Sequence, residues 1–167
     1  MSSGSCRLGL WYVHVYHNGR TIQRIRFATT GISGEVPEEI QKYCAGRMVE
    51  LLMFDTPALN GDEVYPAIYR AVRNIPYGST VTYGEIARQA KTSPRVVGQA
   101  MARNPVPLVI PCHRVVAADG IGGFSPSVEI KEALLGMEKK ALRKLQLEMR
   151  IKPILSNKPD SPSSHEI

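Results

Sequence analysis

The first pattern along the chain is typical of β-strands. Two runs rich in β-branched and aromatic residues, 11–16 and 21–27, flank Asn18-Gly19. Asn-Gly between such runs is the strongest short signal for a β-hairpin. The pattern therefore predicts an antiparallel hairpin over residues 8–27, in which Trp11 lies opposite Arg26.

From residue 36 onward most apolar residues recur at helical spacing. Val36-Pro37 begins a predicted helix that ends near Cys44, which its spacing turns to the buried side. The run 64–73 predicts another helix, with Val64 and Ile68 facing inward. The short apolar run 48–54 predicts a strand, and the loop-like residues 55–62 after it make the best domain boundary.

Two short helices joined by a tight turn are predicted between residues 82 and 103. Thr82 and Glu85 form a capping box, and Ser93-Pro94 is the start signal of the second helix. Such a helix-turn-helix can lay its second helix in a DNA groove. The helices alone leave an alternative open, namely a plain helical hairpin with solvated arginines.

A long helix is predicted to close the folded part of the chain. Ser127 caps it, and an apolar stripe through Ile130, Leu134 and Leu145 follows the helical period. Residues 153–167 are rich in proline and serine and predict a disordered tail.

Composition narrows the class of partner. The chain has 167 residues and a formal net charge of +6, which favours a polyanionic partner, nucleic acid first. The sequence contains no run of about 18 apolar residues, so we predict no membrane span. The N-terminus lacks an apolar signal core, so we expect a cytoplasmic protein, or a nuclear one in a eukaryote.

The cysteines argue against disulfides and metal. Cys6, Cys44 and Cys112 are far apart and odd in number, which favours a reducing compartment. Cys44 is interpreted as a small core residue. A zinc site built from Cys6, His14 and His17 is poorly supported by their spacing, and we predict no metal and no cofactor.

The segment with the clearest chemistry is Pro111-Cys112-His113-Arg114. A thiolate is the nucleophilic form of cysteine, and neighbouring positive charge favours it. An apolar run framed by prolines leads into this segment from Asn104-Pro105, so we expect Cys112 in an extended or turn-like stretch.

These segments together resemble one family. Tyr83, the helix 94–101, the string 104–107 and the string 111–115 look like the O6-alkylguanine-DNA alkyltransferases. The resemblance covers about residues 75–142 and is weak over the N-terminal third. It implies a ribonuclease H-like α/β domain with an antiparallel sheet over 1–62. It also implies a mainly helical, winged-helix-like domain over 63–152.

The resemblance implies irreversible, stoichiometric transfer of an alkyl group from O6-alkylguanine, or from O4-alkylthymine, to Cys112. By the same resemblance, a monomer of the protein binds the minor groove of the duplex that contains the lesion. The damaged nucleotide is flipped out of the base stack. His113 takes the thiol proton through a water, Glu138 orients His113, and Arg114 has a structural role. Asn104 links the second helix to the cysteine turn, and Arg95 fills the gap in the stack.

The resemblance also implies two further sets of residues. The predicted DNA-contact residues are Arg95, Tyr83, Gly84, Thr92, Ser93, Gly98, Gln99 and Ala102. Tyr83 helps to rotate the nucleotide and bonds the flipped base. The predicted lining of the alkyl pocket is Pro107, Val115, Phe124, Ser125 and Pro126. The family usually has glycine where this chain has Pro126, so we expect a tighter pocket.

Three other functions compete with this hypothesis. An alkyltransferase-like protein would bind the lesion without chemistry, but that class commonly has tryptophan where Cys112 stands. A DNA-binding regulator would not explain Cys112 and His113. A cysteine hydrolase would use both residues but would not explain the helix that carries Arg95.

Overall fold

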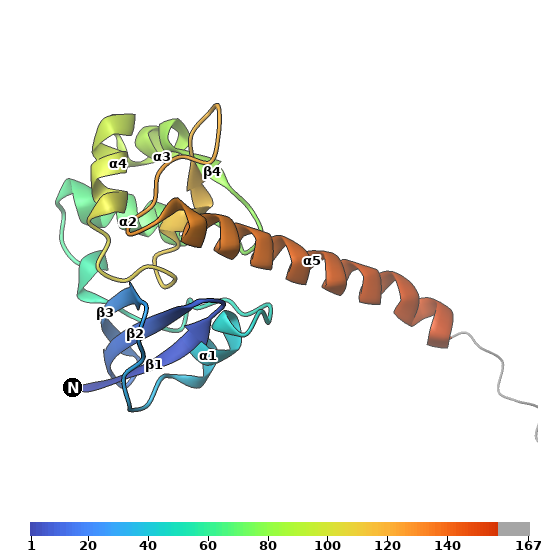
Figure 1. Cartoon of the computed structure of the whole chain (residues 1–167). Coiled ribbons are helices and arrows are strands. Elements are labelled where there is room, and N and C mark those ends of the chain that lie inside the picture. The colour runs from blue at the N-terminus through green and yellow to red at the C-terminus, as the bar shows by residue number, and fades with distance from the viewer. Residues whose placement is uncertain (157–167) are drawn as a thin grey trace, which may run out of the picture.

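The computed structural model describes residues 1–156. The N-terminal part is an antiparallel sheet in the order β1-β2-β3, formed by β1 (Ser2–Leu8), β2 (Trp11–Asn18) and β3 (Thr21–Ala28). The short helix α1 (Glu38–Cys44) packs beside β1 (Figure 1). Cys44 is buried, as its spacing predicted.

The predicted hairpin is confirmed, but its predicted register is wrong. Asn18 pairs with Thr21, so Gly19 and Arg20 form the turn, and Gly19 takes a φ of +61° that suits glycine. An irregularity between Tyr16 and His17 shifts the register again. Arg26 consequently lies opposite His14.

β1 is a strand that the sequence did not predict, and it pairs Leu8 with Trp11.

The predicted strand over 48–54 is also wrong, because this segment forms irregular chain. Leu51 and Phe54 are buried, which explains the apolar run. The side chain of Arg73 donates to the backbone carbonyls of Leu52 and Phe54. In a sheet, these carbonyls would instead accept hydrogen bonds from the backbone of a neighbouring strand. The segment covers the core without joining the sheet.

The helical part begins with α2 (Val64–Arg73), followed by α3 (Tyr83–Ala90) and α4 (Pro94–Ala102). Both halves of the Thr82–Glu85 capping box are formed, and Ser93 caps α4. Thr82 and Val81 form β4 (Val81–Thr82), which pairs in parallel with β5 (Val115–Val116). The predicted inward face of α2 is wrong at Val64, which is 41% exposed, while Tyr69 is buried instead.

The last helix, α5 (Val128–Ser156), begins beside the short turn Cys112–Arg114 and then runs out past the sheet (Figure 1). Ser127 Oγ accepts the backbone N–H of Glu129, as the predicted cap requires. The predicted tail starts too early, since the helix continues through Pro153 to Ser156. Residues 157–167 of that prediction lie outside the described residues.

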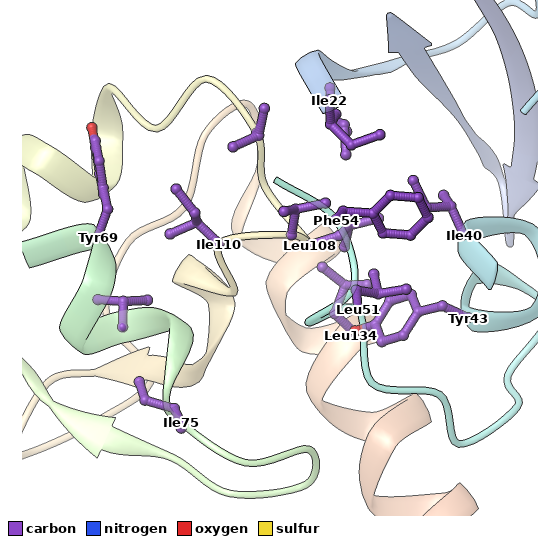
Figure 2. Packing of buried hydrophobic residues seen from close by; sticks show 14 of the residues in the cluster. Ile22, Ile40, Tyr43, Leu51, Phe54, Tyr69, Ile75, Leu108, Ile110 and Leu134 are labelled. Atoms are coloured by element: carbon purple, nitrogen blue, oxygen red, sulfur yellow. The ribbon is translucent and has the colours of Figure 1, made fainter. Parts of the chain in front are cut away.

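One hydrophobic core joins the sheet to the helices. Figure 2 shows Ile22, Ile40 and Phe54 of the N-terminal part clustered with Leu108 and Leu134. A hydrogen bond of 2.9 Å from the Ile25 N–H to the Pro105 carbonyl also joins the two parts. The chain after α4 therefore runs between the two parts of the molecule. Within the part of the chain that is described, no helix is long and apolar enough to cross a membrane.

Candidate functional site

Asn104 fixes the segment that follows α4. Its Nδ2 donates to the Ile110 carbonyl at 2.8 Å, and its Oδ1 accepts the Val106 N–H at 3.0 Å. Leu108, inside this loop, has a φ of +75°, which a non-glycine residue adopts rarely. The Asn104 side chain thus fixes the conformation of the loop through hydrogen bonds to its backbone. The loop in turn fixes the position of Cys112, which follows it.

Cys112 begins a short 3₁₀ turn over Cys112–Arg114, in agreement with the turn-like stretch expected from the prolines. The thiol is free and only 6% of the residue is exposed. Burial raises the pKa of Cys112 to about 11, although a hydrogen bond with Asn104 and the charge of Lys131 oppose the rise. The resting side chain is therefore a neutral thiol that needs a base.

His113 is the base nearest in sequence, and it is completely buried. Its Nε2 lies 2.6 Å from Glu138 Oε2. Burial lowers the pKa of His113 below its usual value, against the pull of Glu138, so the ring is neutral. A neutral ring that donates from Nε2 keeps its lone pair on Nδ1. Nδ1 is buried with no protein partner among the described residues, and it is available to accept a proton.

Glu138 gathers donors from distant segments onto one carboxylate. Arg114 Nε donates to Oε1 at 2.9 Å and Arg114 Nη2 to Oε2 at 3.0 Å. The Gly78 N–H donates to Oε1 at 3.0 Å from a turn where glycine has a φ of +78°. Burial opposes the charge, but His113 and Arg114 outweigh it and hold the pKa of Glu138 well below its usual range. The carboxylate stays ionised and fixes the His113 ring.

A cavity of about 430 Å³ opens above Cys112. The predicted site residues that line it are Tyr83, Gly98, Ala102, Asn104, Pro107, Cys112, Phe124, Ser125 and Pro126. Val115 was predicted to line the pocket and does not, because β5 turns its side chain into the core. The sheet contributes Ile25, Arg26 and Phe27, which the sequence did not indicate. The rings of Phe27 and Phe124 lie 5.8 Å apart and join the sheet to the pocket loop.

The predicted DNA-contact residues lie on α3, α4 and the turn between them. Arg95 and Gln99 are exposed on α4, and Ser93 is exposed at its cap. Gly84 and Thr92 are half-buried. A side chain at Gly98 would meet nothing within 4 Å, so this glycine presents bare backbone at the edge of the cavity. The second helix of the helix-turn-helix therefore borders the same cavity that contains the Cys112 thiol.

The chain is similar to proteins of one known family. Residues 63–140 match the model of the 6-O-methylguanine DNA methyltransferase DNA binding domain. The crystal structure of O6-methylguanine-DNA methyltransferase from Pyrococcus kodakaraensis is 32% identical to the chain. Its superposition has a TM-score of 0.65 over 81% of this chain and 97% of that one. The chain belongs to this methyltransferase family.

Two further relatives are similar to the chain. Mycobacterium tuberculosis OGT, solved in complex with DNA, is 25% identical with a TM-score of 0.69, over 82% of this chain and 92% of that one. The methylated-DNA–protein-cysteine methyltransferase of Methanopyrus kandleri is 58% identical over 71 residues, which are 42% of this chain and 54% of that protein. The chain thus spans about half the length of the curated relatives it matches.

Lys131 belongs to the site, although no pattern in the sequence pointed to it. It is fully buried on α5, and its Nζ donates to the carbonyls of Val115 at 2.7 Å and Gly123 at 3.1 Å. The ammonium also lies 5.7 Å from the centre of the Tyr83 ring. Burial lowers the pKa of Lys131 to about 8, while the nearby Cys112 opposes the shift. Lys131 thus clamps the pocket loop and supplies positive charge near the thiol.

Cys6, His14 and His17, whose spacing poorly supports a zinc site, make other contacts. His14 Nε2 lies 2.6 Å from the Thr30 carbonyl and His17 Nε2 lies 3.0 Å from the Glu35 carbonyl. A hydrogen bond from Cys44 lowers the pKa of Cys6. Among residues 1–156 no group of three or more histidine, cysteine or acidic side chains is arranged to hold a metal.

The raised pKa of Cys112 predicts a specific reactivity. Burial disfavours the thiolate, so iodoacetamide should modify Cys112 slowly at pH 7. The rate should rise about tenfold per pH unit up to pH 10, whereas a free cysteine levels off near its pKa of about 8.5. Peptide mapping after timed exposure measures the rate at Cys112 separately from Cys6 and Cys44. A plateau below pH 9 would contradict the prediction.

Proposed function

We propose that this chain repairs DNA by moving an alkyl group from the O6 atom of guanine in a duplex to Cys112. The observation that carries the proposal is the arrangement of a buried thiol beside His113 and Glu138, in a cavity whose edge is formed by α4. Thiol, base and orienting carboxylate have the roles of a catalytic triad. The family membership supports methyl as the group. We extend the proposal to O4-alkylthymine as a second substrate, as the sequence resemblance implies.

The reaction balances with the groups present. The Cys112 thiol loses its proton, through a water, to His113 Nδ1, and its sulfur attacks the alkyl carbon. A carbon–sulfur bond forms while the bond from that carbon to the guanine O6 breaks. The leaving guanine takes up the proton that His113 held. Glu138 keeps the imidazolium oriented and stabilised in the interval.

The lesion reaches the cavity only if its nucleotide leaves the stack, which costs a few kcal/mol. We infer that Arg95 enters the gap, because it is a long planar cation, exposed near the start of α4. Tyr83 lines the cavity and is placed to bond the flipped base. Because Gly98 and Ala102 are small, this face of α4 can approach the narrow minor groove closely. Contacts from Gly84, Thr92, Ser93 and Gln99 would hold the flanking phosphates.

The finer architecture that we infer has a ribonuclease H-like domain over 1–62 and a winged-helix-like domain over 63–152. Three antiparallel strands followed by α1 support the first part. The small β4–β5 sheet beside the helix-turn-helix supports the second. One copy of the chain lines the cavity with its own residues, which supports a monomer.

The product is a thioether, a poor leaving group, so each molecule should react once. Excess duplex with O6-methylguanine, incubated with a known amount of protein, measures this directly. We expect at most one repaired guanine per protein molecule. Many repaired guanines per molecule would contradict a stoichiometric acceptor, and none would contradict the proposed function.

Pro126 predicts which alkyl groups react well. Its ring lines the cavity, where the family usually has glycine, so methyl should transfer faster than benzyl. Pro126→Gly is expected to raise the benzyl rate by about tenfold and to change the methyl rate little, since relief of overpacking of about 1.4 kcal/mol gives that factor. Rates with O6-methylguanine and O6-benzylguanine in the same duplex measure the effect. Comparable methyl and benzyl rates in the unaltered chain would contradict the prediction.

A further inference from the structure

Tyr43 is a residue of the N-terminal part that reaches the proposed reaction centre. Its hydroxyl donates to Glu138 Oε2 and lies 3.2 Å from His113 Nε2. The side chain comes from the last turn of α1 and is only 1% exposed. Tyr43 is separated from His113 by 70 positions and from Glu138 by 95, so local sequence patterns could not connect them.

The Tyr43 ring is held in place by the side chains around it. Figure 2 shows the ring reaching from α1 toward α5, beside Leu51 and Leu134. The Tyr77 ring meets it edge-on, with centres 5.9 Å apart. Ile40, one turn earlier on α1, is fully buried and anchors the helix. The hydroxyl therefore has little freedom to leave Glu138.

The contact has a chemical consequence for His113. Glu138 Oε2 accepts both the Tyr43 hydroxyl and the His113 Nε2–H. Burial and the charge of Glu138 raise the pKa of Tyr43 well above its ordinary value, so the phenol remains a donor. Arg114 Nη2 also donates to Oε2, and the Tyr43 hydroxyl, as a further donor, withdraws charge that the carboxylate would otherwise offer to the imidazolium. Tyr43 thereby makes His113 easier to deprotonate and holds its partner oxygen in place.

We propose that Tyr43 is a positioning residue of the alkyl-transfer centre, through which the N-terminal part sets the orientation and proton affinity of His113. The inference rests on the proposed function, because it assigns His113 the role of base. With this role for Tyr43, the N-terminal part contributes to proton transfer as well as to the stability of the fold. A tyrosine that only filled the core would contribute packing, and its hydroxyl would be dispensable for the proton transfer.

The test is the pH dependence of methyl transfer by Tyr43→Phe. Without the donor, Glu138 attracts the His113 proton more strongly, so the acid limb of the rate profile should move to higher pH. We expect a shift of about half a unit to one unit, which lowers the rate about threefold to tenfold at pH values below the midpoint of that limb, the size that one hydrogen bond accounts for. An NMR titration of the His113 ring in unreacted protein should shift in the same direction.

Tyr69→Phe is the matched control, since Tyr69 is also buried and donates at 2.8 Å, but to the Ala100 carbonyl. It should lower stability by a similar amount and leave both pH profiles in place. Incorporating 3-fluorotyrosine at position 43 provides a test that keeps the core intact. This better donor should move the acid limb and the His113 titration to lower pH.

The outcomes separate the two proposals. Shifts in opposite directions for phenylalanine and fluorotyrosine would support the inference. An unshifted His113 titration in both variants, beside normal transfer by the unaltered chain, would overturn the inference alone. Failure of the unaltered chain to take up any methyl group would instead overturn the proposed function, whatever the titration shows.

Discussion

Glu138→Ala is expected to lower the free energy of unfolding by about 3–5 kcal/mol and to bring alkyl transfer below detection. The substitution removes the acceptor of Arg114, a buried guanidinium that lies 2.9 Å from Oε1, and leaves that charge with little compensation. It also removes the group that fixes the His113 ring. Chemical denaturation and the rate of methyl transfer measure the two effects.

Glu132→Ala is the control, because Glu132 lies on the same helix and is exposed. It should change both quantities little. Glu138→Gln should separate stability from chemistry, since the amide keeps the shape and loses the charge. Transfer by Glu138→Ala at a rate near that of the unaltered chain would contradict the role given to this carboxylate.

Arg95→Ala is expected to slow repair in duplex DNA about 100-fold, which corresponds to about 2.7 kcal/mol of the cost of extruding the nucleotide. Arg95 is exposed on α4 and does not line the cavity, so it should not affect the chemistry at Cys112. Free O6-methylguanine base needs no extrusion, and its transfer rate should stay the same. The ratio of the two rates is the measurement.

Arg47→Ala matches the loss of one exposed positive charge at a distance from the helix-turn-helix. It should lower the duplex rate only slightly, through the weaker overall attraction to DNA. Equal losses for duplex and free base in Arg95→Ala would show that Arg95 acts on the chemistry or on folding, and would contradict its role in the stack.

Local signals explain what the sequence predicted well. The Thr82–Glu85 capping box, the Ser93 cap and the Ser127 cap each depend on residues within a few positions, and all three are formed. The predicted hairpin register was wrong because the turn is formed by Gly19 and Arg20, and because the irregularity at Tyr16/His17 leaves no mark in the pattern. The segment 48–54 failed because its apolar residues serve a core that is built from distant elements.

In the candidate site, too, local signals identified some residues, and contacts between distant segments explain the others. The string from Asn104 to Arg114 identified the thiol, the base and the loop that holds them, and the family resemblance supplied Glu138. No local pattern distinguishes Lys131 from the other lysines of α5, although it is buried and donates to two carbonyls. Tyr43 could be found only after folding brought α1 to α5. Contacts between distant segments therefore account for the residues that were missed.

The most direct test of the central claim is the mass of the intact protein after incubation with duplex DNA that carries one O6-methylguanine. We expect one methyl group to replace one hydrogen, with the modification mapped to Cys112 and absent in Cys112→Ala. No change in mass despite tight, lesion-dependent binding would contradict alkyl transfer and indicate a protein that only recognises the lesion.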